Sequence, residues 1–511
     1  MALVWGGSAF GSSGSTTVPA AGPSWTVYHG APSGIGIAAT VSSVNVASPA
    51  WTSPTLDGVL YGEPLVSDGQ VFVATENGTV YALSGTKGTI DWSSHLATPV
   101  PSSSLPCGDI SPTVGITGTP VLDVARGEVF VVADEMVNGK PAHQLVGLST
   151  ATGKVEVNQN VDPEGSTPAA LLQRTGLTLD AGRVIFGYGG NFGDCSTYHG
   201  WVMSVPETGG TPAPYTVDSA AGESQGAIWM GGAAPVVDAR GNIWVTTGNG
   251  SVTSADHAYD DSDAVLELSP ALTLEQYFAP SSWASDNARD LDFSTGVGLL
   301  GDGETIAASK SRTVFLLNGS SLGGIGGQQA ELADACSTVI DGGLAVAGSI
   351  VYLPCLSGPI AVQTSDSPPG LRLLWNSSVG GGPPIVAGGL VWTIGSNGVL
   401  YGLNPSSGKV TDQATIGAPA NHFQTPSIGA GLLLAPSSNR VVAFSASTAA
   451  AAPSVSTTTT VPRATTTPSV PMGQSAGVKV QIIAAAVVGG LAVLATVAWL
   501  FRRHRNVGGD A

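Results

Sequence analysis

A unit of short apolar runs separated by glycine turns recurs along residues 60–445, and it constrains the fold more than any other feature. The clearest copy, at residues 62–92, reads GEPLVSDGQVFVATENGTVYALSGTKGTIDW. Its Asp68-Gly69 and Asn77-Gly78 pairs are hairpin dipeptides, and the apolar runs that follow them are typical of paired strands. Repeats of about 40 to 50 residues made of strands and turns indicate the blades of a propeller.

The number of blades follows from the two ends of the repeat region. Seven units are recognisable, and a short eighth at residues 425–445 ends where an outer strand with a tryptophan should follow. The segment SPAWTSPTLDG, residues 48–58, is an outer strand without a blade, and its Trp51 takes the position of Trp92 in the clearest copy. Joining it to the last unit removes an open sheet edge. We therefore predict an all-β, eight-bladed propeller closed by an N-terminal strand, with seven blades as the alternative.

The C-terminal region predicts an anchor in a membrane. Residues 480–501 carry no charge, and a helix that rises about 1.5 Å per residue would cross a ~30 Å hydrocarbon core with them. Arginines follow at once, and positively charged residues stay on the cytoplasmic side. We therefore expect a flexible segment 1–24, a propeller 25–446 outside the cell membrane, a Ser/Thr/Pro-rich stalk 447–479, one transmembrane helix 480–501 and a short basic cytoplasmic tail 502–511.

The first residues, MALVWGGSAFGSSGSTT, do not resemble a secretory signal. They contain neither a basic region nor a long apolar run. Export of the region ahead of a C-terminal anchor normally needs a leader, so we expect the natural start to lie upstream.

Four single cysteines predict two disulfides. Cys107, Cys195, Cys336 and Cys355 form no CxxC pair, which argues against structural zinc and suits an oxidising compartment. Four cysteines can form two disulfides in three ways. Because Cys336 and Cys355 lie in one repeat and Cys107 and Cys195 lie in consecutive repeats, we predict these two pairs.

The repeat resembles a known family at several positions. Residues 82–92, ALSGTKGTIDW, are similar to the tryptophan-docking repeat of pyrroloquinoline-quinone-type propellers, the quinoprotein dehydrogenase-like family. Residues 402–409, GLNPSSGK, and 147–154, GLSTATGK, resemble it without the tryptophan. In that family the tryptophan packs between neighbouring blades, so Trp51 and Trp92 are expected to dock blades, and its absence from the other two copies implies less regular packing there. Three further segments resemble bacterial secreted members, starting at Trp25, Tyr188 and Trp229.

The resemblance also implies a cofactor, which the residues do not support. Quinoprotein dehydrogenases hold the quinone beside a calcium ion, with a Glu and an Asn as ligands, an Asp as base, a stacking Trp and a ring of two adjacent cysteines. This chain has no Cys-Cys pair, and no residues can be assigned to the other roles. We therefore expect no cofactor and no catalytic residues, and keep pyrroloquinoline quinone with calcium as the alternative.

Two groups of residues are candidates for ligand contacts. In the acidic stretch DHAYDDSD, the carboxylates Asp260, Asp261 and Asp263 suit calcium, although the EF-hand spacing is absent and a solvated loop is the competing interpretation. His199, Trp201 and Asn249 are candidates for the ligand-binding mouth of the channel. A packed tryptophan and a hydrogen-bonded histidine beside a disulfide are the alternative there.

Two hydrolase-like patterns carry no prediction of catalysis. Gly-x-Ser-x-Gly occurs around Ser224 and Ser321. A nucleophile elbow also needs a strand before it and a helix after it, and neither context is helical.

Charge and repeat together favour a binding function. The net charge of −18 repels phosphate backbones, which argues against nucleic acid as a partner. Our leading hypothesis is a membrane-anchored extracytoplasmic scaffold that binds an envelope protein or a glycan. The alternative is a quinone- and calcium-dependent dehydrogenase of alcohols or sugars. A propeller glycosidase would need two carboxylates about 5 to 9.5 Å apart, and no such pair is indicated.

Overall fold

The strands of the clearest repeat form one antiparallel sheet in chain order. They are β4 (Leu65–Ser67), β5 (Gln70–Ala74), β6 (Thr79–Ser84) and β7 (Ile90–His95). The first three strands are almost entirely buried, whereas β7 alternates between exposed and half-buried residues. An outermost strand has one face towards water, so this alternation identifies the edge of a blade.

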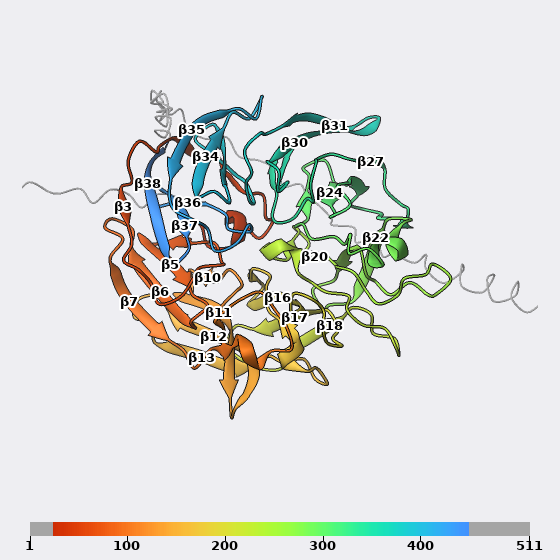
Figure 1. The fold of residues 1–511 in the computed structure, drawn as a ribbon, viewed down its shortest axis with the longest axis horizontal. Helices are drawn as coiled ribbons and strands as arrows, with labels where there is room; N and C mark the ends of the chain where they lie inside the picture. The colour runs from red at the N-terminus through yellow and green to blue at the C-terminus, as the bar shows by residue number, and fades with distance from the viewer. Residues whose placement is uncertain (1–23, 449–511) are drawn as a thin grey trace, which may run out of the picture. The chain divides into compact units, whose positions relative to one another are not determined.

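The computed structural model describes residues 24–448, and eight such sheets follow one another around a ring (Figure 1). We number the sheets as blades 1 to 8 in chain order, starting from β4–β7. Blade 2 contains β10 (Val121–Asp123), β11 (Glu128–Val137), β12 (Lys140–Ser149) and β13 (Val155–Asn160). Blade 3 contains β14 (Leu171–Leu172), β15 (Thr178–Asp180), β16 (Arg183–Gly190), β17 (Trp201–Pro206) and β18 (Ala213–Thr216). Blade 4 contains β19 (Val236–Val237), β20 (Ile243–Thr246), β21 (Val265–Leu268) and β22 (Leu274–Ala279), with β26 (Gly324–Ile325) at its edge.

The remaining blades continue the same order. Blade 5 contains β23 (Gly298–Leu299), β24 (Glu304–Ala308), β25 (Val314–Asn318) and β27 (Ala330–Leu332). Blade 6 contains β28 (Ala345–Ala347), β29 (Ile350–Leu353), β30 (Ile360–Asp366) and β31 (Pro369–Asn376). Blade 7 contains β32 (Ile385–Ala387), β33 (Leu390–Ile394), β34 (Val399–Leu403) and β35 (Val410–Thr415), with β1 (Ile37–Ala38) beside β32. Blade 8 contains β36 (Ser427–Gly429), β37 (Leu432–Ser437) and β38 (Arg440–Thr448). Outside the blade sheets lie β8 (Val100–Pro101), β9 (Thr113–Val114), η1 (Tyr28–Gly30), η2 (Ser102–Ser104), η3 (Pro168–Ala170), η4 (Met230–Gly232) and α1 (Trp283–Asn287).

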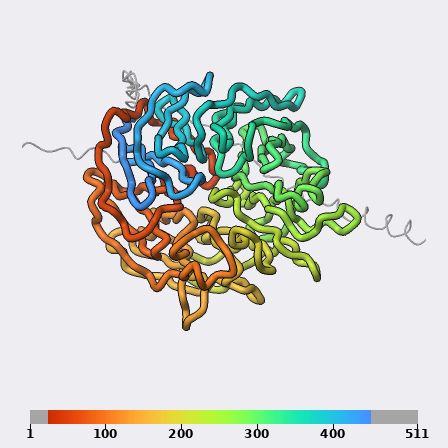
Figure 2. The backbone as a smooth tube through the Cα atoms, in the orientation of Figure 1, coloured from red at the N-terminus to blue at the C-terminus, as the bar shows by residue number. Residues whose placement is uncertain are grey.

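N-terminal strands complete blade 8, as the sequence predicted. In β3 (Trp51–Thr52), Trp51 pairs with Ala443 of β38, and β2 (Val41–Asn45) pairs with the end of the same strand. Figure 2 shows this red part of the chain beside the blue C-terminal strands. The prediction of eight blades is therefore confirmed, and the ring has no unpaired blade edge at its closure.

Tryptophans from outer strands lock three blade interfaces. The indole Nε1 atoms of Trp51, Trp92 and Trp375 donate to the carbonyl oxygens of Gly85, Thr150 and Pro405 of the next blade, at 2.8, 2.7 and 2.8 Å. A glycine with positive φ lies under each ring, and a Cβ there would collide with it, at Gly88, Gly153 and Gly408. The turns of residues 147–154 and 402–409 receive the tryptophans of the preceding blades. The outer strands of these two repeats, β13 and β35, carry no tryptophan, and less regular packing of these strands stays a prediction.

The two faces of the ring differ in the length of their loops. One face, which we call the loop face, carries the connections between blades and those between the second and third strands of a blade, such as residues 96–120 and 191–200. The opposite turn face carries the short first-to-second and third-to-fourth turns. Within residues 24–448, no helix is long and apolar enough to cross a membrane. The predicted stalk, transmembrane helix and tail, like the first 23 residues, lie outside the described part of the chain.

Candidate functional site

The start of the described chain fills the central channel of the propeller. Its backbone hydrogen-bonds to the innermost strands of five blades, at Val66, Leu122, Val237, Val346 and Val386. Figure 1 shows this red segment near the centre of the ring. Since innermost strands line the axis of a propeller, residues 25–38 form a plug, the name we use for this segment below.

Buried polar contacts hold the plug in place. The carboxylate of Glu63 accepts hydrogen bonds from Trp25 Nε1 at 3.0 Å and from the backbone N–H of His29 at 2.8 Å. His29 is 1% exposed, and its Nδ1 lies 2.9 Å from the carbonyl oxygen of Leu344, which directly precedes the innermost strand of blade 6. The ring of Tyr28 stacks on His29 at 4.2 Å. Burial lowers the pKa of His29 to about 4, so the plug carries a neutral imidazole at neutral pH.

The mouth of the channel on the loop face is closed above the plug. Arg174, between β14 and β15 of blade 3, lies over the ring of Phe423, before blade 8, with 3.9 Å between its Cζ and the ring centroid. Tyr28 and Glu63 of the channel lie beneath them, and the space between these residues is about 10 Å³. That volume holds roughly one water molecule.

A tricyclic quinone does not fit this mouth. Pockets for ligands of that size have volumes of about 300 to 1,000 Å³. Tyr28 and His29 occupy the axis below the mouth and are 4% and 1% exposed. The space at the mouth, at about 10 Å³, is therefore smaller than such a ligand needs.

An ion pair lies beside the mouth. Nζ of Lys310 lies 2.7 Å from Asp292 Oδ1 and 3.0 Å from Asp290 Oδ1, and 5.5 Å from the centre of the Trp229 ring. Burial raises the pKa of Asp292 to about 6 against the effect of Lys310, so the pair is charged at neutral pH. These residues tie the loop between blades 4 and 5 to blade 5.

The three acidic residues predicted to bind a cation are engaged separately. Asp260 accepts a hydrogen bond from Ser262 Oγ, and Asp261 accepts one from the hydroxyl of Tyr215 at 2.7 Å. Asp263 is 1% exposed, and burial and the charge of Asp292 raise its pKa well above the usual range. Among residues 24–448, no group of three acidic, histidine or cysteine side chains is arranged to hold a metal ion. Cation binding at these residues stays a prediction.

The predicted ligand-face residues lie in different environments. His199 is partly exposed, and its Nδ1 lies 2.8 Å from Asp218 Oδ1, so it is a hydrogen-bonded loop histidine. Trp201 begins β17, is 9% exposed and packs in the hydrophobic core of blades 2 and 3, which matches the alternative interpretation. Asn249 lies on the loop face with a buried Oδ1 that has no partner among the described residues. The rings of His199 and Trp201 lie edge to face with 6.3 Å between their centroids, and ligand binding at these residues and at Asn249 stays a prediction.

Disulfides brace the loop face. Cys107 pairs with Cys195, and Cys336 pairs with Cys355, as predicted. The first bridge joins the connection between blades 1 and 2 to the loop between β16 and β17. Phe192, in that loop, is 69% exposed. It is the most exposed large apolar side chain among residues 24–448.

The plug was the feature that sequence reasoning missed. Residues 25–36, WTVYHGAPSGIG, entered only through a family resemblance. The dense aromatic residues after a Gly/Ser-rich start were the available signal for a buried segment. Its partners, such as Leu344, lie hundreds of residues away, and no local pattern indicates them.

Comparisons with known proteins agree with the fold. Residues 38–264 match the family model described as outer membrane protein assembly factor BamB, which confirms the resemblance to the pyrroloquinoline-quinone-like propeller family. A comparison with curated protein sequences gives no match. The quinohemoprotein alcohol dehydrogenase from Comamonas testosteroni is similar in structure, with a TM-score of 0.61 and 15% identity over 83% of this chain and 80% of that one. A europium-containing methanol dehydrogenase has a TM-score of 0.58 and 12% identity over 81% of this chain and 89% of that one. At these identities the likeness shows the fold alone.

Proposed function

We propose that this pyrroloquinoline-quinone-like propeller is a membrane-anchored extracytoplasmic module that binds an envelope protein or a glycan on its loop face. The plug carries this proposal. Because residues 25–38 fill the channel and hydrogen-bond to five blades, the place where a small substrate would enter is taken by the chain itself. The exposed loop face is then the surface available for recognition.

An envelope protein is the favoured partner. The family model that matches residues 38–264 is described as an assembly factor of outer membrane proteins. The exposed Phe192 beside the bridge of Cys107 and Cys195 offers an apolar anchor on a fixed loop. Rigid aromatic anchors of this kind contribute a large share of the energy of protein interfaces.

The sequence of the C-terminal region supports anchoring in a membrane. The uncharged residues 480–501 would span the bilayer, and the arginines after them would hold the tail on the cytoplasmic side. The Ser/Thr/Pro-rich stalk 447–479 would then place the propeller at a distance from the membrane surface.

Site-specific photocrosslinking in the native cell tests the proposal. A photoreactive amino acid replaces Phe192 on the loop face, and a matched variant carries it at Val124, which is 53% exposed on the turn face. We expect a discrete adduct from position 192 and none from position 124. Mass spectrometry of the adduct distinguishes the partners: peptides of a second protein identify a protein, and a glycosidase-sensitive mass without such peptides identifies a glycan. No adduct at position 192, or equal adducts at both positions, would contradict binding through the loop face.

The alternative is a quinone- and calcium-dependent dehydrogenase. Two similar solved structures carry the names of alcohol and methanol dehydrogenases, at 15% and 12% identity. Dye-linked oxidation of alcohols or sugars after addition of the quinone and calcium would support this alternative. The absence of such oxidation would favour the binding module.

A further inference from the structure

The interface between blades 4 and 5 lacks the tryptophan that locks other interfaces. Gln276 of β22 pairs with Glu267 of β21, in the register that places Trp92 opposite Ala82 in blade 1. Its Nε2 donates to the carbonyl oxygen of Gly319 at 3.0 Å, and its Oε1 accepts from the N–H of Leu322 at 2.8 Å. Gln276 thus takes the position of the tryptophan and makes the hydrogen bond that the indole makes between blades 1 and 2.

The turn that receives Gln276 is equivalent to the turns that receive tryptophan. The N–H of Gly319 donates to the carbonyl oxygen of Gly303, just as the N–H of Thr150 donates to the carbonyl oxygen of Gly127 between blades 1 and 2. Gly319 and Thr150 are the acceptors for Gln276 and Trp92, respectively. The two interfaces can therefore be compared position by position.

The equivalent spaces at the two interfaces differ in size. Between blades 4 and 5, a cleft of about 260 Å³ opens on the turn face, whereas the equivalent space between blades 1 and 2 is about 20 Å³. Trp244 lines the larger cleft where Phe72 lines the smaller one. Leu299 and Leu300 add apolar walls.

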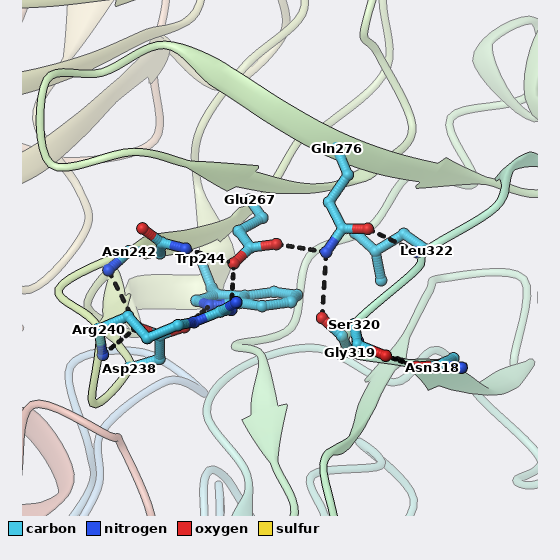
Figure 3. A network of polar contacts seen from close by, with 10 residues as sticks. All are labelled: Asp238, Arg240, Asn242, Trp244, Glu267, Gln276, Asn318, Gly319, Ser320 and Leu322. Atoms are coloured by element: carbon cyan, nitrogen blue, oxygen red, sulfur yellow. Dashed lines mark hydrogen bonds and ion pairs between the residues drawn. The ribbon is translucent and has the colours of Figure 1, made fainter. Parts of the chain in front are cut away.

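Polar groups lie at one side of the cleft. Figure 3 shows Arg240 beside Asp238 and Glu267, and Gln276 between Glu267 and the turn at Gly319. The guanidinium of Arg240 is therefore already paired with two carboxylates. The network fixes the wall of the cleft and leaves it acidic.

Glu304 supplies the free polar group. It lines the cleft, is 8% exposed, and its Oε2 is buried without a hydrogen-bond partner among the described residues. A buried carboxylate oxygen without a donor is unfavourable, and an N–H or ammonium group from a ligand would satisfy it.

We propose that this inter-blade cleft binds a small planar aromatic amine. The ring would lie in the cleft against Trp244 and Leu299, and the ammonium group would pair with Glu304. The volume suits one bicyclic ring and excludes larger cofactors, since drug-sized ligands need about 300 to 1,000 Å³. The site lies on the face opposite the loop face and does not depend on the proposed partner there.

Calorimetric titration of the full chain with tryptamine tests the proposal. We expect saturable binding with one site and a Kd on the order of 1 mM or tighter, as for a ligand of this size. Gln276→Trp fills the cleft and should abolish binding. Glu304→Gln should weaken tryptamine at least about tenfold, a typical effect of losing a charged hydrogen bond, while Glu331→Gln, an exposed glutamate of the same blade, should leave the affinity unchanged.

A ligand of opposite charge and a check of folding serve as controls. Indole-3-acetate carries the same ring with a negative charge and should bind at least about tenfold more weakly than tryptamine, because it meets Glu304 and Glu267. Circular dichroism checks that Gln276→Trp is folded, and Glu304→Gln tests the site independently of that variant. No saturable binding of tryptamine, or binding that both variants leave unchanged, would overturn the proposal.

Discussion

The indole Nε1 of Trp51 donates a hydrogen bond of 2.8 Å to the carbonyl oxygen of Gly85. Trp51 belongs to the N-terminal strand that completes blade 8, and Gly85 belongs to blade 1. One contact therefore joins the last blade to the first. The same contact recurs with Trp92 and Trp375 at two other interfaces. The first and last blades are therefore joined by the same kind of contact that joins other neighbouring blades.

Trp51→Ala should destabilise the propeller strongly. Trp51 is 8% exposed, and its loss removes both the ring and the hydrogen bond that close the circle. Buried tryptophan-to-alanine changes cost about 3 to 5 kcal/mol. Urea unfolding measures the change, with Ile90→Ala, at a 40% exposed residue of β7, as the control. Equal effects of the two substitutions would contradict closure through Trp51.

Gly88→Ala should cost more than Gly69→Ala. Both glycines have positive φ, +68° and +77°, so each alanine pays a strain of about 1 to 2 kcal/mol. A Cβ at Gly88 meets the Trp51 ring, whereas a Cβ at Gly69 meets nothing within 4 Å. The difference in unfolding free energy between the two variants isolates the contact with the ring. Equal stability of the two variants would contradict the close contact between the Trp51 ring and Gly88.

His143 should make stability fall as the pH rises. Burial lowers its pKa, but Asp134 at 2.9 Å and Asp162 at 2.7 Å outweigh this and raise it to about 10. Between about pH 6.5, the usual pKa of histidine, and pH 10, only the folded state holds the proton, so unfolding becomes easier by up to ~1.4 kcal/mol per pH unit. Free energies of unfolding across this range, compared with His143→Gln, measure the contribution. A variant with the same pH profile as the native chain would refute the buried charged histidine.

The bridge between Cys107 and Cys195 should stabilise the fold more than the bridge between Cys336 and Cys355. The first closes 88 residues and the second 19. Restriction of the unfolded chain then contributes about 4.6 and about 3.2 kcal/mol, respectively. Urea unfolding of the two double Cys→Ala variants compares them. The opposite order would mean that native contacts, not loop length, decide the effect of these bridges.

The sequence predicted the features that recur along the chain. Glycine turns, apolar runs and the positions of Trp51 and Trp92 repeat with the blades, so they indicated eight blades and the closing strand. The disulfides followed from the blade order. Trp375 was not recognised, because the turn before it, TSDSPPG, lacks the Thr-Gly-Lys pattern that precedes Trp92.

The features that occur once were not predicted. The plug depends on contacts such as that of His29 with Leu344, which only the closed ring brings together. Gln276 has no distinguishing local pattern, and its role appears only when it is aligned with Trp92 through strand register. His199 and Trp201 were grouped from their nearness in sequence, and their rings do lie edge to face. The burial of Trp201, however, depends on core residues of blades 2 and 3 that no local pattern indicates.

The measurement that tests the proposed function most directly is titration of the purified full chain with pyrroloquinoline quinone and calcium, followed by melting temperature and dye-linked turnover. Because Tyr28 and His29 fill the channel beneath Arg174 and Phe423, we predict no saturable rise in melting temperature and no turnover. A saturable rise accompanied by oxidation of alcohols or sugars would contradict the binding module and establish the dehydrogenase.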